Sequence, residues 1–269
     1  MDAISSRHNA FVQRCRAVAR RRDAASGEVL LDGVHLLGDA LAAGVPIDEA
    51  AATPAVWESA EGAPLARRLE SAGVRLHAAA AQAIEAASPV RSPTGLVALG
   101  RWSPVPLARA LAPQPALVVC AVGVQDPGNL GALVRAADAA GATAVVVSSG
   151  SADPLGWKAL RGSMGSAFRV PIVAGADVQA ACADARARGI RVVAAVPAGG
   201  TALYDCDLTG PVLLLVGGEG AGLPEPLRQQ ADVSLRIPMR PAVESLNVAV
   251  AAGVVLFEAR RQRTLVGTP

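Results

Sequence analysis

The feature that most constrains the fold is a series of continuous apolar runs in the second half of the chain. The expected strands are Ala116–Val122, Ala144–Val147, Ile190–Val196, Val212–Val216 and a weaker Val233–Ile237. Helical patterns lie between or after these strands, at residues 129–140, 178–188 and 245–261. Runs that are apolar on both faces suit strands that are covered on both sides, as in a parallel sheet. The alternation therefore predicts a layered α/β fold.

The first hundred residues predict a second, smaller α/β unit. Its expected strands are Val29–Leu31, Val74–Leu76 and Gly95–Leu99, and its expected helices are Gly33–Ala43 and Leu65–Ala72. Four prolines follow between residues 104 and 115, and proline at this density breaks regular structure and stiffens a connection. The sequence thus predicts a smaller domain over 1–103, a proline-rich linker over 104–115 and a larger domain over 116–269.

Length and composition exclude several classes of protein. A chain of 269 residues is long enough for about two domains without disulfide or metal support. The longest apolar stretch, near residues 248–257, is shorter than the roughly 18–20 residues that span a bilayer. The start has no apolar signal-peptide core, and the four cysteines lack C-x-x-C spacing. We expect a cytoplasmic protein with reduced, mostly buried thiols, no membrane contact and no metal.

Basic residues are concentrated at the start of the chain, although the net charge is only +2. No acidic residue stands between Asp2 and Asp23, whereas six arginines do: Arg7, Arg14, Arg16, Arg20, Arg21 and Arg22. Arginine forms bidentate contacts with phosphate, so this cluster suits a nucleic acid. A solvated helix face is the alternative interpretation.

Two glycine-rich stretches resemble nucleotide-binding motifs but lack their essential residues. Gly123–Gly128 has the glycine spacing of a P-loop, yet Asn129 and Leu130 follow where the motif needs Lys and Ser or Thr. The later stretch Gly217–Gly222 lacks the G-x-G-x-x-G spacing of a dinucleotide site. The sequence favours neither a kinase-like nor an ordinary Rossmann enzyme.

The first of three candidate loops opens the helix at 129–140. Asn129 either caps this helix or serves a site. Arg135 stands among apolar neighbours, where it either pairs with Asp138 or is available to a ligand.

The other two loops follow later strands. In Gly217–Gly222 the glycines allow a ligand close to the backbone, and Glu219 is the single ionisable side chain, although a tight turn would need the same residues. The third loop, 237–248, contains Ser245 and Asn247, each of which could be an ordinary helix cap. Open α/β sheets gather ligand-binding segments at strand ends, so the joint arrangement of the three loops predicts a ligand site.

These loops resemble the motifs of the SpoU (TrmH) family of RNA 2′-O-ribose methyltransferases, within the SPOUT class. The three motifs correspond to Asn129–Arg135, Gly217–Leu223, and Ile237–Met239 together with Ser245–Val248. Residues 161–171 are similar to the segment that links the first two motifs, and the likeness covers about 116–262. Residues 5–45, including 6–9 and 31–37, more loosely resemble the family's L30e-like substrate-binding domain.

The resemblance implies a SPOUT-type parallel sheet with a trefoil knot, S-adenosylmethionine as methyl donor, and a homodimer whose active site lies near the subunit interface. The catalytic residues it implies are Arg135, Asn129, Glu219, Ser245 and Asn247. The implied cofactor-binding residues are Gly217, Gly218, Gly220, Leu223, Ile237, Met239 and Leu246. The candidate RNA-binding residues are Arg7, Arg14, Arg16, Arg20, Arg21 and Arg161.

Methyl transfer to a ribose hydroxyl needs no metal, because the leaving thioether gains no negative charge. It needs a close approach of oxygen to methyl and a path for the hydroxyl proton. The resemblance places Arg135 near the 2′-hydroxyl, often as the proposed base, but arginine is protonated at ordinary pH. Alternatively Arg135 binds the RNA phosphate, and the proton leaves to water or to Glu219. Asn129 would position Arg135 or the ribose.

The separate N-terminal domain favours ribosomal RNA as the substrate. A transfer-RNA 2′-O-methyltransferase is the alternative within the same chemistry. A non-catalytic RNA-binding protein on the same scaffold is a competing hypothesis, disfavoured by the intact motif residues. Methylation of a base is disfavoured because other SPOUT branches use different motifs.

Overall fold

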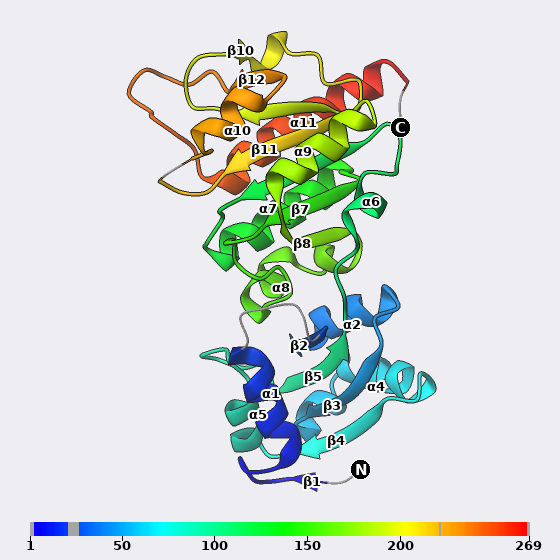
Figure 1. The fold of residues 1–269 in the computed structure, drawn as a ribbon. Coiled ribbons are helices and arrows are strands. Elements are labelled where there is room, and N and C mark those ends of the chain that lie inside the picture. Colours follow the sequence, from blue (N-terminus) through cyan, green and yellow to red (C-terminus); the bar gives the residue numbers. More distant parts are fainter. Residues whose placement is uncertain (1–2, 21–26, 221, 268–269) are drawn as a thin grey trace. The chain divides into compact units, whose positions relative to one another are not determined.

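The computed structural model describes residues 3–20, 27–220 and 222–267. The chain forms two compact units (Figure 1). The N-terminal unit comprises Met1–Ser103 and Leu155–Phe168, and the C-terminal unit comprises Pro104–Pro154 and Arg169–Pro269. Among the described residues, no helix is long and apolar enough to cross a membrane.

The C-terminal unit is built on a seven-stranded sheet. Its strands are β6 (Leu117–Val122), β7 (Ala144–Ser148), β8 (Ile172–Ala176), β9 (Arg191–Ala195), β10 (Thr201–Ala202), β11 (Val212–Gly217) and β12 (Val233–Arg236). They lie in the order β10-β12-β9-β11-β6-β7-β8, and neighbouring strands pair in parallel. The predicted parallel sheet is confirmed. Two strands were not predicted: β8 contains a glycine, and β10 has only two residues, so neither forms an apolar run.

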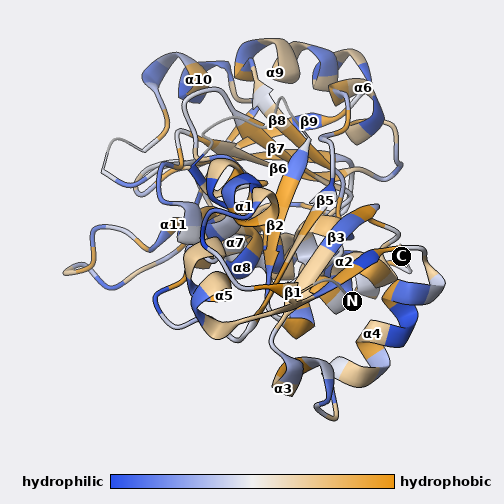
Figure 2. Cartoon of the chain, turned by 90° about the horizontal axis from the view of Figure 1, so that it is seen from below, coloured by the Kyte–Doolittle hydropathy of each residue, from blue (hydrophilic) through white to orange (hydrophobic). Residues whose placement is uncertain are grey.

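Helices cover both faces of this sheet. On one face lie α6 (Leu107–Ala110), α9 (Val178–Ala187) and α10 (Glu225–Gln230), and on the other α7 (Pro127–Ala140) and α11 (Val248–Leu265). Figure 2 shows β6 and β7 as hydrophobic along most of their length and hydrophilic residues on α10. Successive side chains of a strand point to opposite faces, so strands between two helical layers must be apolar on both sides.

The proline-rich segment is part of the C-terminal unit. It contains α6, and both Ala110 and Leu111 are fully buried in the core formed with β6, β7 and α9. The Val105 N–H also donates to the carbonyl of Ile172 at 2.8 Å. The segment expected to be a linker therefore packs onto the sheet, and its apolar residues between the prolines are the reason.

The C-terminal end of α11 is anchored by the buried side chain of Arg263. Its guanidinium donates to four backbone carbonyls, those of Leu208 at 3.1 Å, Gly210 at 2.6 Å, Ala116 at 2.9 Å and Pro115 at 3.3 Å. Burial lowers the pKa of this guanidinium from its ordinary value. Arg263 thus joins α11 to the start of β6 and to the loop before β11.

The N-terminal unit is a five-stranded mixed sheet with helices around it. Its strands are β1 (Ala3–Ile4), β2 (Glu28–Asp32), β3 (Ile47–Ala52), β4 (Arg75–Ala79) and β5 (Leu96–Arg101), in the order β1-β4-β3-β5-β2. Its helices up to residue 103 are α1 (Ala10–Arg20), α2 (Val34–Ala42), α3 (Pro54–Trp57), α4 (Gly62–Ser71) and α5 (Ala81–Ala87). Strand β5 is antiparallel to β2 and β3. Strand β3 was missed because two acids and three alanines follow its single isoleucine.

A segment from the second half of the chain folds with the N-terminal unit. Residues 155–168, which follow β7 in sequence, contain α8 (Trp157–Ser163) and a 3₁₀ turn (Ser166–Phe168). The indole N–H of Trp102 donates to the Ala167 carbonyl at 3.1 Å, and its ring lies 6.5 Å from that of Phe168. The predicted boundaries assign this segment to the larger domain, whereas the structure groups it with the smaller one. The implied trefoil knot stays a prediction.

Candidate cofactor cleft and active site

The loop after β11 needs its glycines because the protein's own backbone passes close to them. A Cβ atom at Gly217 would lie 2.2 Å from the backbone of Gly222, and one at Gly218 would lie 2.1 Å from the carbonyl oxygen of Gly123. Gly220 and Gly222 have positive φ angles of 82° and 62°, which favour glycine. The Gly218 N–H donates to the carbonyl of Val122 at 2.8 Å. The loop is therefore folded against the end of β6.

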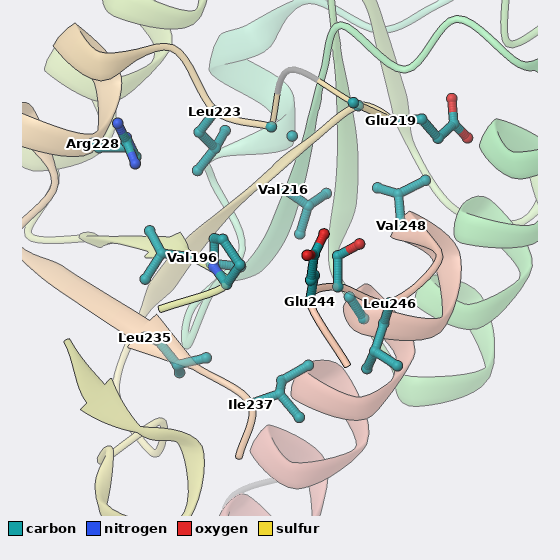
Figure 3. Close-up of a pocket in the computed structure, with 18 of the residues that line it drawn as sticks. Val196, Val216, Glu219, Leu223, Arg228, Leu235, Ile237, Glu244, Leu246 and Val248 are labelled. Carbon is teal, nitrogen blue, oxygen red and sulfur yellow. The ribbon is translucent and has the colours of Figure 1, made fainter. Parts of the chain in front are cut away.

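A cleft of about 450 Å³ opens beside this loop, at the carboxyl ends of β9, β11 and β12 (Figure 3). All seven residues predicted to bind the cofactor line it: Gly217, Gly218, Gly220, Leu223, Ile237, Met239 and Leu246. Glu219 and Ser245, two of the predicted catalytic residues, line it as well. Two of the three predicted loops, 217–223 and 237–248, are thus brought to one cavity, whereas Asn129 of the first loop does not line it.

The cleft suits a small organic ligand in size and in chemistry. Its volume lies within the roughly 300–1,000 Å³ of typical ligand sites. Apolar side chains form most of its walls, among them Val196, Val216, Leu235, Ile237 and Leu246. Within the described residues, segment 238–246 has one backbone hydrogen bond, from the Val243 N–H to the Arg240 carbonyl. Peptide groups beside the cleft are therefore available to a polar ligand edge.

Three predicted catalytic residues form a chain of side-chain hydrogen bonds. Asn247 caps α11, since its Oδ1 accepts from the N–H groups of Ala249 at 3.0 Å and Val250 at 3.3 Å. Its Nδ2 donates to Oδ1 of Asn129 at 2.9 Å, and Nδ2 of Asn129 donates to Oε1 of Glu219. In both Asn247 and Asn129 the side-chain oxygen accepts a hydrogen bond and the side-chain nitrogen donates one. This series of hydrogen bonds therefore orients the Glu219 carboxylate.

Asn129 is not the cap of its own helix. Asp126 caps α7 instead, with Oδ1 accepting from the Asn129 N–H at 2.7 Å, and Pro127 follows it. The capping interpretation of Asn129 is therefore wrong. Because a neighbour performs that function, the Asn129 side chain is available for Asn247 and Glu219.

Arg135 is exposed on α7, and the ion pair considered for it is not formed. Asp138 bonds to Arg169 instead, with Oδ2 at 2.9 Å from Nε and from the terminal nitrogen Nη2. Within the described part of the chain, no hydrogen bond or ion pair holds the Arg135 guanidinium. Unlike Glu219 and Ser245, Arg135 does not line the cleft.

Comparison with known proteins decides the family. The model of the SpoU rRNA Methylase family matches residues 116–257, more than half of the chain. The chain belongs to this family.

Relatives of the SpoU family match the chain at two different extents. A protein of Synechocystis, described as an uncharacterized tRNA/rRNA methyltransferase, is 33% identical over 99% of this chain and 96% of its own length. The 23S rRNA (guanosine-2′-O-)-methyltransferase RlmB of Xylella fastidiosa is 44% identical over 56% of this chain and 61% of its own length. The match to RlmB thus spans less than two thirds of that protein.

A solved SpoU-type structure matches nearly the whole chain. The AdoMet-bound rRNA methyltransferase of Sinorhizobium meliloti is 32% identical, with a TM-score of 0.84, and the match covers 97% of both chains. The predicted family, the α/β class and the predicted class of enzyme, a methyltransferase, are therefore confirmed.

The arginines at the start of this SpoU chain do not share one role. Arg14, on α1, bonds to Glu49 at 2.5 Å and to Glu28 at 3.2 Å, and it lies 3.7 Å from Asp48. These carboxylates already compensate its charge, so Arg14 holds α1 on the sheet.

The other candidate arginines differ in exposure. Arg7 and Arg20 are exposed, and Arg16 is half-buried. Arg161 is exposed on α8 in the same N-terminal unit. Arg21 lies outside the described residues.

Several residues that line the cleft are not among those predicted from the sequence. Val196 and Pro197 follow β9, and the rule that ligands bind at the carboxyl ends of parallel strands would have found them. Glu244 and Arg228 also line the cleft. No spacing signal identifies Arg228, which stands on the short helix α10, whereas Glu244 directly precedes a recognised motif.

Proposed function

We propose that this SpoU-family chain methylates a ribose 2′-hydroxyl of ribosomal RNA. The observation that carries this proposal is that two of the three predicted loops line one cleft, while Asn129 of the first loop is joined to both of them by hydrogen bonds to Asn247 and Glu219. The relative RlmB is named for guanosine 2′-O-methylation of 23S rRNA, which supports both the hydroxyl and the class of RNA.

S-adenosylmethionine is the methyl donor, and the related S. meliloti structure contains it. When bound, it supplies an electrophilic methyl group on a sulfonium sulfur. The apolar walls around Val216, Leu235 and Ile237 suit its adenine ring, and the free peptide groups of 238–246 suit the polar edge of that ring. The cleft residues thus bind and orient the donor.

The hydrogen-bonded chain gives Glu219 a defined role. One of its oxygens is engaged by Asn129, so the other can accept the hydroxyl hydrogen as the oxygen attacks. Arg135, protonated at ordinary pH, binds an RNA phosphate rather than acting as a base. Ser245 shapes the rim of the cleft beside Asn247.

Mapping of ribose methylation in a deletion strain tests the substrate and the role of Arg135 together. We expect one ribosomal nucleotide to lose its methyl group and to regain it with the wild-type gene but not with Arg135→Ala. Arg135→Lys should restore part of the methylation, because the positive charge remains. Loss confined to transfer RNA would contradict the ribosomal substrate, and full rescue by Arg135→Ala would contradict the role of Arg135.

The protein acts as a homodimer in which the second subunit covers the exposed apolar face of α11. Val250 and Phe257 are 52% and 49% exposed, and their spacing of seven residues places them on one helix face with Val254 between them. An apolar face of this kind favours a second subunit. We expect Phe257→Asp to give monomers in size-exclusion chromatography with light scattering. Tyr204→Asp, at a side chain that is 66% exposed outside α11, should remain dimeric.

The N-terminal unit binds RNA as an L30e-like domain, through Arg7, Arg16, Arg20 and Arg161. Arg14 contributes to the position of α1 and not to phosphate binding. The protein acts in the cytoplasm, where its substrate is and where its four free, buried cysteines stay reduced.

A further inference from the structure

The cofactor cleft contains three charged side chains, and they differ in what surrounds them. Glu219 is bonded to Asn129. Arg228 is paired with Glu225 on its own helix. Glu244 also lines the cleft, and no hydrogen bond or ion pair to it is found within the described part of the chain. Figure 3 shows its carboxylate among the apolar side chains, whereas Glu219 and Arg228 lie at different edges of the view.

We propose that Glu244 selects the charged methyl donor over the spent product. This proposal rests on the assignment of S-adenosylmethionine to the cleft. In the reaction the S–CH₃ bond breaks and an O–CH₃ bond forms. The electron pair of the broken bond stays on sulfur, and the hydroxyl proton passes from the ribose oxygen to the Glu219 carboxylate. The sulfonium becomes a neutral thioether, so the cofactor loses one positive charge while its shape changes by one methyl group.

A carboxylate in the cleft binds the charged form of the cofactor more strongly than the neutral form. Glu244 attracts the sulfonium of the donor, and this attraction is absent for S-adenosylhomocysteine. Glu219 and Glu244 give the cleft two negative charges, while the single positive charge, that of Arg228, is already compensated by Glu225. The field in the cleft therefore favours a cation. Product release becomes easier for the same reason.

The size of the effect follows from Coulomb's law with solvent screening. Glu244 is exposed, so an effective dielectric constant between that of a protein surface and that of water applies. For charges about 6 Å apart this corresponds to roughly three- to tenfold in affinity at low salt. The effect shrinks as ionic strength rises.

Calorimetric titration of the full-length protein tests the proposal without measuring activity. The ligands are S-adenosylmethionine, S-adenosylhomocysteine and sinefungin, whose amine carries a positive charge in place of the sulfonium. In Glu244→Gln we expect the Kd for S-adenosylmethionine and sinefungin to rise three- to tenfold, and that for S-adenosylhomocysteine to change less than twofold. Asp184→Asn, which removes one exposed charge of the same unit outside the cleft, should change none of the three.

Each other outcome overturns the proposal in a distinguishable way. Equal weakening of all three ligands would mean that Glu244 only supports the loop. Unchanged affinities would mean that it does not sense the ligand. If the wild-type protein bound none of the three ligands, the cofactor assignment itself would fail. Thermal unfolding of Glu244→Gln is measured alongside, and Glu244→Asp should retain part of the preference for the cation.

Discussion

The side chain of Asn247 performs two tasks that one substitution can separate. Its Oδ1 caps α11, and its Nδ2 donates to Asn129, which in turn donates to Glu219. Asn247→Asp keeps the capping oxygen but replaces the donor with a second acceptor. The new oxygen would face Oδ1 of Asn129 across a contact that measures 2.9 Å in the wild-type protein. The Asn129 amide is then expected to rotate so that it donates to Asp at position 247.

Rotation of Asn129 removes the hydrogen bond that orients Glu219. A hydrogen bond to a charged group contributes about 1.5–3 kcal/mol, and because Glu219 is exposed and Asn129 is partly exposed, we expect the lower half of that range. If the wild-type bond between Asn129 and Glu219 persists in the transition state, its loss in Asn247→Asp lowers kcat about 10- to 40-fold, at about 1.4 kcal/mol for each factor of ten. Asp and Asn are equally good N-caps, and a negative charge at a helix N-terminus stabilises it. The free energy of unfolding should therefore change by less than about 1 kcal/mol.

The assay compares single-turnover methylation of an RNA substrate with urea unfolding of the same preparations. Asn247→Ser, which keeps a cap but neither donates to Asn129 nor repels it, should lose less activity than Asn247→Asp. Asp177→Asn is the matched control, because Asp177 caps α9 with bonds of 2.9 and 3.2 Å away from the cleft. Wild-type kcat in Asn247→Asp would refute the orienting role of the chain. An equal loss in Asp177→Asn would show that cap chemistry alone is responsible.

Three further predictions concern the rest of the molecule. Arg263→Met removes a buried cation from four carbonyls, so urea unfolding should show that the free energy of unfolding falls by about 3–5 kcal/mol. A decrease below about 1 kcal/mol would contradict the anchoring role. Arg16→Ala should reduce the slope of log K for RNA against log salt by about 0.7–0.9, whereas Arg14→Met should weaken binding with little change in slope. Burial raises the pKa of Asp232, but bonds from the Val192 N–H and Arg186 outweigh this and leave it lowered. Its carboxylate therefore stabilises the fold above about pH 4, and this stabilisation is lost as pH falls through the folded pKa. In Asp232→Asn the free energy of unfolding should therefore depend less on pH between pH 2 and 6 than in the wild-type protein.

The sequence predicted those parts of the fold that depend on local pattern. The apolar runs of β6, β7, β9 and β11 indicated a parallel sheet, because strands covered on both faces cannot alternate in polarity. The motif residues around Gly217, Ile237 and Leu246 were also identified, and the structure places them around one cleft.

Partnerships between distant residues were not accessible from the sequence. The helical spacing predicted an ion pair between Arg135 and Asp138, but in the fold Asp138 pairs with Arg169, which is 31 positions away in the sequence. The sequence also indicated Asn129 as a possible helix cap, whereas the side chain of Asp126, three residues earlier, caps the helix. The arginine cluster looked uniform, yet among its described members only Arg14 pairs with the acids of β2 and β3.

By itself, then, the sequence determined which segments become buried strands and which loops carry glycine and polar motifs. These are properties of short stretches, and burial periodicity and backbone freedom act within a few residues. Only the tertiary structure decided that residues 155–168 join the N-terminal unit, that Asn247 reaches Asn129 across 118 positions, and that Glu244 lines the cleft without a described partner. Such pairings depend on which surfaces pack together, and packing is a property of the whole chain.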